Sequence, residues 1–160
     1  MASALYVAFA IALLVQSPPV SKPDFLGTWT MDRDRSESAS DEQAIGPITL
    51  AISQTETTLT IETKLGDKSE VANYVIETRP DGPSVIGAGT RRAYWDASQL
   101  ITEGAGNVQG QTVSIRATRT LNATGSEMTV ETMVAVQHGY TMRGAQTYAR
   151  VKDVYLRSPR

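Results

Sequence analysis

Short runs of alternating apolar and polar residues, each followed by turn residues, fill most of this chain of 160 residues. The clearest two runs are residues 48–53 and 58–63, which are separated only by a short polar stretch. Because side chains alternate between the two faces of a strand, each run predicts a strand with one apolar face. Their close spacing predicts that the two strands pair as a hairpin.

The same rhythm continues along the chain, and no stretch has a convincing helical period. We predict about nine antiparallel strands, with turn chemistry between neighbours. Residues 33–43 are charged and rich in serine, which predicts a long loop with room for one helical turn. Such a chain is all-β and folds as a sandwich or as an up-and-down barrel. The predicted strands are residues 26–32, 48–53, 58–63, 71–78, 90–95, 100–104, 112–121, 128–136 and 142–152.

The N-terminus differs from the rest of the chain. Residues 1–21 carry no charged side chain, and residues 4–15 are almost wholly apolar. A membrane span needs about 20 apolar residues, so this run is short for one. It predicts a signal peptide at 1–21, with an uncleaved anchor as the alternative, and hence a periplasmic or secreted protein. One barrel domain at 22–155 and a frayed tail at 156–160 follow.

Charge and cysteine content exclude several classes of function. The formal net charge is −2 with no basic cluster, which argues against nucleic acid as a partner. The absence of cysteine removes thiol nucleophiles, thiolate metal sites and disulfides. The one histidine, His138, lies in a predicted turn, so neither a catalytic triad nor a histidine metal site is expected. We expect a monomer with no metal, no cofactor and no catalytic residue.

A tripeptide at the start of the first predicted strand carries a family resemblance. Gly27, Thr28 and Trp29 resemble the Gly-x-Trp signature of lipocalins and their relatives, and Tyr148 and Arg150 lie on a terminal strand as in that plan. The chain looks like the lipocalin-like, calycin-type domains of exported bacterial proteins. The resemblance implies an antiparallel up-and-down barrel of about eight to ten strands. Structural roles are expected for Gly27, as a point of close backbone approach, and for Trp29, as a buried plug.

The longest predicted strand places an arginine on an apolar face. In a closed barrel one face of every strand looks inward, and here the more apolar face includes Arg119. A buried guanidinium must be paired or await an anionic ligand; alternatively, it reaches water at the strand end or stacks on Trp29. The residues on this face are Val113, Ile115, Ala117, Arg119 and Leu121.

These features predict a carrier or sensor of a small hydrophobic or amphipathic molecule, such as an anionic lipid. The apolar tail is expected along Leu50, Ile61, Tyr74 and Val130. A filled interaction module is the alternative, and an isomerase or cyclase that uses Glu103 is a further one; fold alone does not choose. Membrane contact is expected only through an uncleaved leader. The predicted ligand-binding residues are Tyr74, Trp95, Arg119, Val130 and Tyr148.

Overall fold

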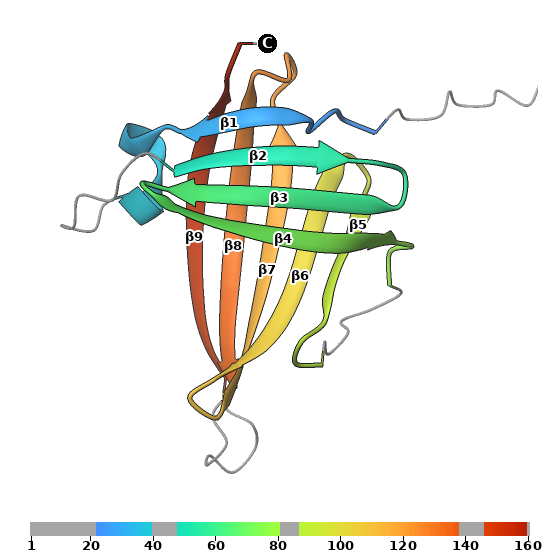
Figure 1. The fold of residues 1–160 in the computed structure, drawn as a ribbon, viewed down its shortest axis with the longest axis vertical. Helices are drawn as coiled ribbons and strands as arrows, with labels where there is room; N and C mark the ends of the chain where they lie inside the picture. Colours follow the sequence, from blue (N-terminus) through green and yellow to red (C-terminus); the bar gives the residue numbers. More distant parts are fainter. Residues whose placement is uncertain (1–21, 40–47, 81–86, 138–145, 160) are drawn as a thin grey trace, which may run out of the picture.

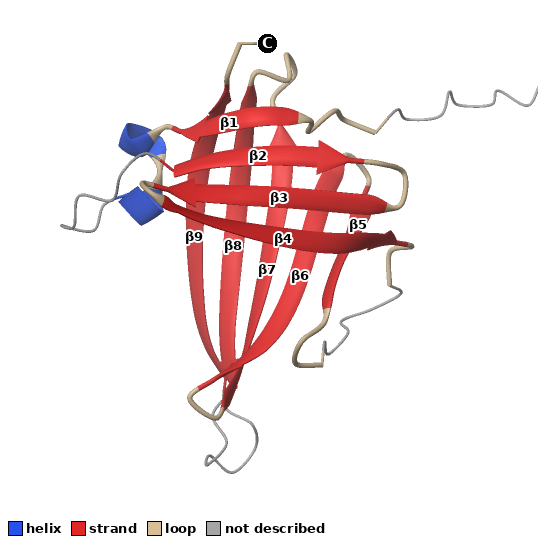
Figure 2. Cartoon of the chain, viewed as in Figure 1, coloured by secondary structure: helices blue, strands red, loops and turns tan. Residues whose placement is uncertain are grey.

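The computed structural model describes residues 22–39, 48–80, 87–137 and 146–159 of the chain. These residues form a closed barrel of nine strands and two short 3-10 helices (Figure 1, Figure 2), which confirms the predicted all-β barrel. None of the helices in these ranges has the length and hydrophobicity needed to cross a membrane. The elements are β1 (Gly27–Met31), η1 (Arg33–Arg35), η2 (Glu37–Ala39), β2 (Ile48–Gln54), β3 (Thr58–Leu65), β4 (Lys68–Glu77), β5 (Arg91–Asp96), β6 (Gln99–Val108), β7 (Gln111–Leu121), β8 (Glu127–Gln137) and β9 (Gln146–Arg157).

Each predicted strand has an observed counterpart, and the first hairpin is confirmed by the pairing of β2 with β3. The boundaries differ at β6, which runs from Gln99 to Val108 rather than over 100–104, and at β4, which begins at Lys68 rather than at residue 71. The polar stretch after β1 contains η1 and η2. The last strand is longer than predicted, because β9 continues to Arg157 rather than ending at residue 152. The predicted leader at 1–21, the turn with His138 and the start of the predicted last strand at 142–145 lie outside the described residues.

One pair of neighbouring strands is parallel, so the prediction of a wholly antiparallel barrel is wrong at one seam. β4 and β5 run in the same direction and pair over three positions, from Val75 with Arg92 to Glu77 with Tyr94. Nine strands of strictly alternating direction would make β1 and β9 parallel. A single parallel seam reverses the alternation, and β1 closes the barrel antiparallel to β9. A parallel pair requires a crossover connection, which residues 78–90 supply.

The strands form two layers that cross each other. In Figure 1, β1 to β4 pass crosswise in front of β6 to β9, and β5 lies at the side where the two layers join. The apolar faces of both layers meet in one buried cluster, and the burial of this surface is the main stabilising contribution. Its members are Phe25, Trp29, Met31, Leu50, Ile52, Leu59, Ile61, Ala93, Leu100, Ala117, Met128, Val130 and Tyr155.

Gly27 has a conformational role rather than the predicted close approach. Its φ is +120°, in a region that side-chain-bearing residues rarely adopt. A Cβ atom added to Gly27 would meet no atom within 4 Å, so no neighbouring backbone requires a glycine there. The prediction that Gly27 lets another chain segment approach is therefore wrong. The glycine is required because the chain enters β1 with an unusual backbone angle.

The segment that follows β1 covers part of the edge of β9 with side chains. Ser36 accepts a hydrogen bond from the backbone N–H of Val154 (2.9 Å), and its hydroxyl donates to the Val154 carbonyl (3.2 Å). Ser38 donates two hydrogen bonds to Oδ1 of Asp153, from its backbone N–H (3.0 Å) and its hydroxyl (2.7 Å). The two Ser36 bonds take the place of a neighbouring strand and protect an edge that would otherwise be open to pairing with another chain, whereas the Ser38 bonds fix the Asp153 side chain.

Candidate functional site

Arg119 is a buried cation in the interior of the barrel. It lies on the same face of β7 as the core residue Ala117, and only 7% of its surface is exposed. Burial lowers the pKa of Arg119 from its ordinary value, because the charged form loses its hydration. Electrostatic interactions with Tyr74 and Tyr155 act in the opposite direction and raise this pKa.

The guanidinium of Arg119 is incompletely satisfied. Its Nη1 donates one hydrogen bond of 2.8 Å to Oγ1 of Thr102, a neutral partner on β6. Its Nε is buried and has no hydrogen-bond partner. Within the described ranges, no carboxylate forms an ion pair with Arg119. A buried charge without a counter-ion is costly, so this arrangement differs from an ordinary structural ion pair.

Two tyrosines bring hydroxyl groups toward the same interior. Tyr74 comes from the inner face of β4, and Tyr155 belongs to the core cluster on β9. Burial, followed by the nearby carboxylate of Asp153, raises the pKa of Tyr155 to about 12, while Arg119 lowers it. Neither hydroxyl forms a hydrogen bond with any part of the chain that the structure describes. Arg119, Tyr74 and Tyr155 therefore present donors that no group among the described residues uses.

The inner face of the barrel becomes accessible along β7, away from Arg119. Ile115 lies on the same face, one full strand repeat beyond Ala117, yet 48% of its surface is exposed. It is opposite Gly104 on β6, and the next inward pair joins Val113 to Gly106. A Cβ atom added to Gly106 would meet nothing within 4 Å. The interior is thus packed around Arg119 and accessible over an apolar wall beside it.

Three residues predicted to contact the ligand's tail belong to the packed core instead. Leu50, Ile61 and Val130 have at most 6% of their surface exposed. Val130 is the direct neighbour of Arg119 across the β7–β8 pair. Because these side chains already pack against one another, they offer almost no free surface for an apolar tail. The accessible apolar surface lies at Ile115, which the alternation pattern did not distinguish from the rest of its face.

Trp95 lies on the inner face level with Arg119, and Leu100 on β6 stands between the two residues. Trp95 is partly buried, and its ring centroid lies 5.9 Å from that of Phe25. The ammonium of Lys22, the first residue that the structure describes, lies 5.5 Å from the centroid of the Trp95 ring. These contacts give Trp95 a packing role at that end of the barrel. The backbone of Tyr148 pairs with Ala135, and its side chain lies outside the described set.

Glu103 lies on the outer face of the barrel, so it does not meet Arg119 as the isomerase alternative required. Its carboxylate accepts hydrogen bonds from Arg92 Nη2 at 2.6 Å and from the Tyr94 hydroxyl at 3.0 Å. Arg116 Nη1 lies 3.8 Å from the same carboxylate. Burial raises the pKa of Tyr94, and its hydrogen bond to Glu103 adds to the shift. This cluster is fully paired and tethers β5, β6 and β7 on the outside.

Arg157, which the sequence analysis placed in a frayed tail, occupies a defined position at the junction of β9 and β1. Its guanidinium carbon lies 4.4 Å from the centroid of the Trp29 ring, and Trp29 is fully buried. The alternative in which Arg119 stacks on Trp29 is therefore wrong, since Arg157 occupies that place. The sequence feature that could have indicated the position of Arg157 is the alternation after Asp153, which puts Tyr155 and Arg157 on one face of the strand.

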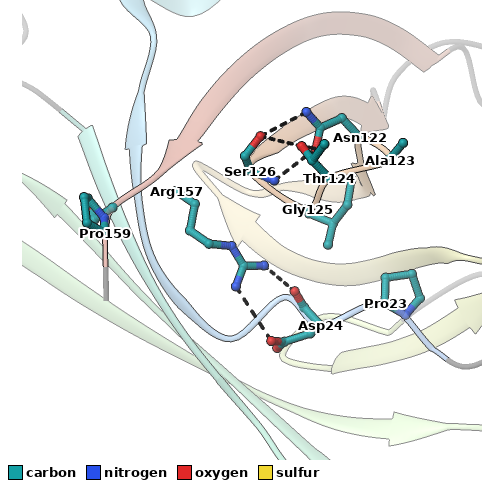
Figure 3. Close-up of a pocket in the computed structure, with 11 residues that line it drawn as sticks. Pro23, Asp24, Asn122, Ala123, Thr124, Gly125, Ser126, Arg157 and Pro159 are labelled. Carbon is teal, nitrogen blue, oxygen red and sulfur yellow. Dashed lines mark hydrogen bonds and ion pairs between the residues drawn. The ribbon is translucent and has the colours of Figure 1, made fainter.

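An open groove of about 710 Å³ lies on the outside of this junction (Figure 3). Most of its polar groups are already engaged, although Nε of Arg157 is buried without a hydrogen-bond partner. Oδ1 of Asn122 accepts hydrogen bonds from the backbone N–H of Ser126 and from the Thr124 hydroxyl. Arg157 donates to the backbone carbonyl of Asp24 and forms an ion pair with its carboxylate. These bonds hold the β7–β8 turn and the chain entering β1, so the groove is a weaker candidate than the interior. Its lining is Pro23, Asp24, Leu121, Asn122, Ala123, Thr124, Gly125, Ser126, Arg157, Ser158 and Pro159.

A metal centre is not formed by the described residues, among which no three His, Cys, Asp or Glu side chains come together as ligands. The described residues form a closed β-barrel with a buried tryptophan on its first strand and an arginine from its last strand stacked on that tryptophan. No protein-family model matches the chain, and no curated protein matches it significantly.

Solved structures with a similar fold include two that cover most of the chain. The fluorescent protein UnaG is 14% identical, with a TM-score of 0.45 over 84% of this chain and 97% of UnaG. A protein described as the REP1-NXSQ fatty acid transporter is 10% identical, with a TM-score of 0.39 over 84% of this chain and 96% of the transporter.

Proposed function

We propose that the barrel binds a small amphipathic molecule through an anionic head group, and that it serves as a carrier or sensor of that molecule. The observation that carries this proposal is the buried guanidinium of Arg119, which has one neutral hydrogen-bond partner and no carboxylate partner in the described structure. An anionic ligand supplies the missing counter-charge.

A carboxylate is the head group that best fits the available donors. Arg119 offers Nε and its remaining amino hydrogens, which form charge-assisted hydrogen bonds with carboxylate oxygens. The hydroxyls of Tyr74 and Tyr155 add neutral donors near Arg119, because both residues lie on the inner face and act electrostatically on its guanidinium. In a poorly hydrated interior such bonds are stronger than in water, and the same ligand relieves the desolvation cost of Arg119.

The apolar body of the ligand is expected to follow the inner face of β7 toward Ile115. The core side chains around Trp29 and Leu50 fill the interior in the other direction. Ile115 and its glycine neighbour Gly104 leave apolar surface that water reaches in the absence of a ligand. Covering that surface contributes favourably to binding, at about 25 cal/mol per Å² of apolar area.

We further propose that the protein is exported by a bacterium and works in the periplasm or outside the cell. The support is the uncharged, apolar stretch at residues 1–21, whose composition fits a signal peptide. A fold that holds itself together without any cysteine is compatible with either redox environment.

The test of ligand binding is a titration of a fluorescent fatty acid into the wild-type protein and Arg119→Leu. We expect saturable binding to wild type and a loss of roughly 1.5–3 kcal/mol in the variant, the range for hydrogen bonds to charged groups. Arg150→Leu is the matched control, since Arg150 is exposed on β9 with Glu131 as its partner. The proposal fails if the wild-type protein shows no saturable binding of fluorescent fatty acids of any chain length.

A further inference from the structure

Arg91 is a second arginine on the inner face of the barrel. It shares the inward phase of β5 with Ala93, a core residue, and with Trp95, which packs against the core. Arg91 pairs with Gly104 on β6, and its Cγ lies 3.6 Å from the place that a Gly104 Cβ would occupy. Its aliphatic stem therefore lies along the inner wall rather than projecting from the outside of the barrel.

The present partner of the Arg91 guanidinium is loosely held. Nη2 lies 3.7 Å from Oε1 of Glu70, and the two side chains are 47% and 79% exposed. An ion pair this exposed contributes little to stability, because water screens both charges. Exchanging Glu70 for an anionic group of a ligand would thus cost the protein little stability.

Arg91 and Arg119 lie at opposite ends of the accessible inner wall. Arg119 is level with Leu100 on β6, whereas Arg91 is level with Gly104. Four residues of strand separate these levels, about 13 Å at roughly 3.3 Å per residue, and β6 itself separates the two strands. The level between them is formed by the small buried residues Ala93, Thr102 and Ala117, and the exposed Ile115 lies level with Arg91, on the other side of Gly104. One cation is thus deep and the other is at the accessible end of the same wall.

We propose that the ligand carries two anionic groups, one at each end of an apolar body, and that Arg91 binds the outer one. The inference rests on the proposed function, because it assumes that the first anionic group is bound at Arg119. An amphiphile with a single head group would leave Arg91 paired only with Glu70. A dicarboxylate uses both guanidinium groups, and the part of its apolar body next to the outer carboxylate covers Ile115.

The test is a thermodynamic cycle between Arg91 and the second carboxylate. Dissociation constants are measured by calorimetry for straight-chain monocarboxylates and the matching α,ω-dicarboxylates, from octanoate to hexadecanoate in length. Wild type and Arg91→Gln are compared. The ratio of the two constants in each protein cancels any general effect of the substitution. We expect Arg91→Gln to weaken dicarboxylate binding about two- to fivefold relative to monocarboxylate binding, the range for an exposed charge pair.

Two further variants sharpen the test. Glu70→Gln removes the competing carboxylate and is expected to strengthen dicarboxylate binding, whereas Arg150→Gln, an exposed arginine on β9, is expected to leave the ratio unchanged. If wild type binds monocarboxylates and the ratio is the same in Arg91→Gln at every chain length, the second anionic site is wrong and the proposed function stands. If wild type binds neither series, the proposed function fails and this inference fails with it.

Discussion

The guanidinium of Arg157 stacks on the ring of Trp29 at 4.4 Å and so joins the last strand of the barrel to the first. The same side chain donates a hydrogen bond of 3.0 Å to the carbonyl of Leu26, just before β1. Arg157 therefore satisfies the backbone carbonyl of Leu26 and covers one face of the buried Trp29 indole. Two distant parts of the sequence depend on this contact for closure of the barrel.

Replacement of Trp29 is expected to be severe. Trp29→Ala should lower the free energy of unfolding by about 3–5 kcal/mol, because a fully buried indole is lost and a cavity is left. Chemical denaturation followed by circular dichroism measures the change. Thr30→Ala, on the neighbouring position of β1, is the control. A loss below about 1 kcal/mol would be typical of a surface site and would contradict the packing described here.

Arg119 is expected to favour binding of an anionic ligand and to lower the stability of the unliganded protein. Arg119→Met should leave the unliganded protein as stable as wild type or more so, because an apolar side chain replaces an uncompensated buried charge. The same variant should lose binding of an anionic ligand. Thermal unfolding with and without a fatty acid measures both effects. If Arg119→Met unfolds readily without ligand, Arg119 has a structural role instead; Thr102→Val controls for the loss of its hydrogen bond.

The protein is expected to lose stability in alkali because of Tyr155. The pKa of Tyr155 is raised to about 12 in the folded state, and the unfolded value is about 10. Between these values the unfolded chain releases a proton that the folded chain retains, so the free energy of unfolding falls as pH rises. The loss is of order 2–3 kcal/mol across this window. In Tyr155→Phe the free energy of unfolding should change less between pH 10 and 12 than in wild type. Chemical denaturation at several pH values measures this dependence. An unchanged slope would exclude this origin.

The outer cluster around Glu103 is expected to matter for stability and not for ligand binding. Glu103→Gln should cost about 3 kcal/mol, because Arg92, whose side chain is only 15% exposed, loses its counter-charge. Glu131→Gln disrupts an exposed pair with Arg150 and should cost less than about 1 kcal/mol. Urea denaturation and the fatty-acid titration separate the two properties. Loss of binding in a stable Glu103→Gln protein would show that the outer face contributes to the site.

Export is expected to remove the apolar leader. N-terminal sequencing of the protein isolated from its own host should begin between Pro18 and Asp24. Cell fractionation should find this form outside the cytoplasm. A protein that begins at Ala2 and stays with the cytoplasmic fraction would contradict the signal peptide, and one that begins at Ala2 in the membrane fraction would indicate an uncleaved anchor.

The alternation pattern predicted the fold well because hairpin partners are close in sequence. β2 and β3 each display the period of two, and their pairing needs no information from elsewhere. The parallel β4–β5 seam was missed because alternation is the same in parallel and antiparallel strands. Arg157 was missed because its partner Leu26 is 131 residues away, and no local pattern reports such a contact.

The candidate site was predicted only in part, for a related reason. The phase of β7 placed Arg119 on the face that turned out to be internal, since its neighbours on that face are mostly apolar. On β6 both faces mix apolar and polar residues: Leu100 and Thr102 point inward, while Ile101 and Glu103 point outward. Period two separates these faces but does not say which is internal. The accessible wall at Ile115 depends on where the opposite layer ends, which only the three-dimensional arrangement determines.

The pairing of β1 with β9 also constrains when the barrel can close during folding. Contacts between the two ends of a chain form late, because their loop-closure entropy is the largest. A chain that is still emerging from the ribosome lacks Arg157 and Tyr155, and Trp29 then has nothing to pack against on that side. Such a barrel stays open along β1 until β9 has been made. Synthesis of β9, rather than formation of any single hairpin, is therefore the step that allows the barrel to close.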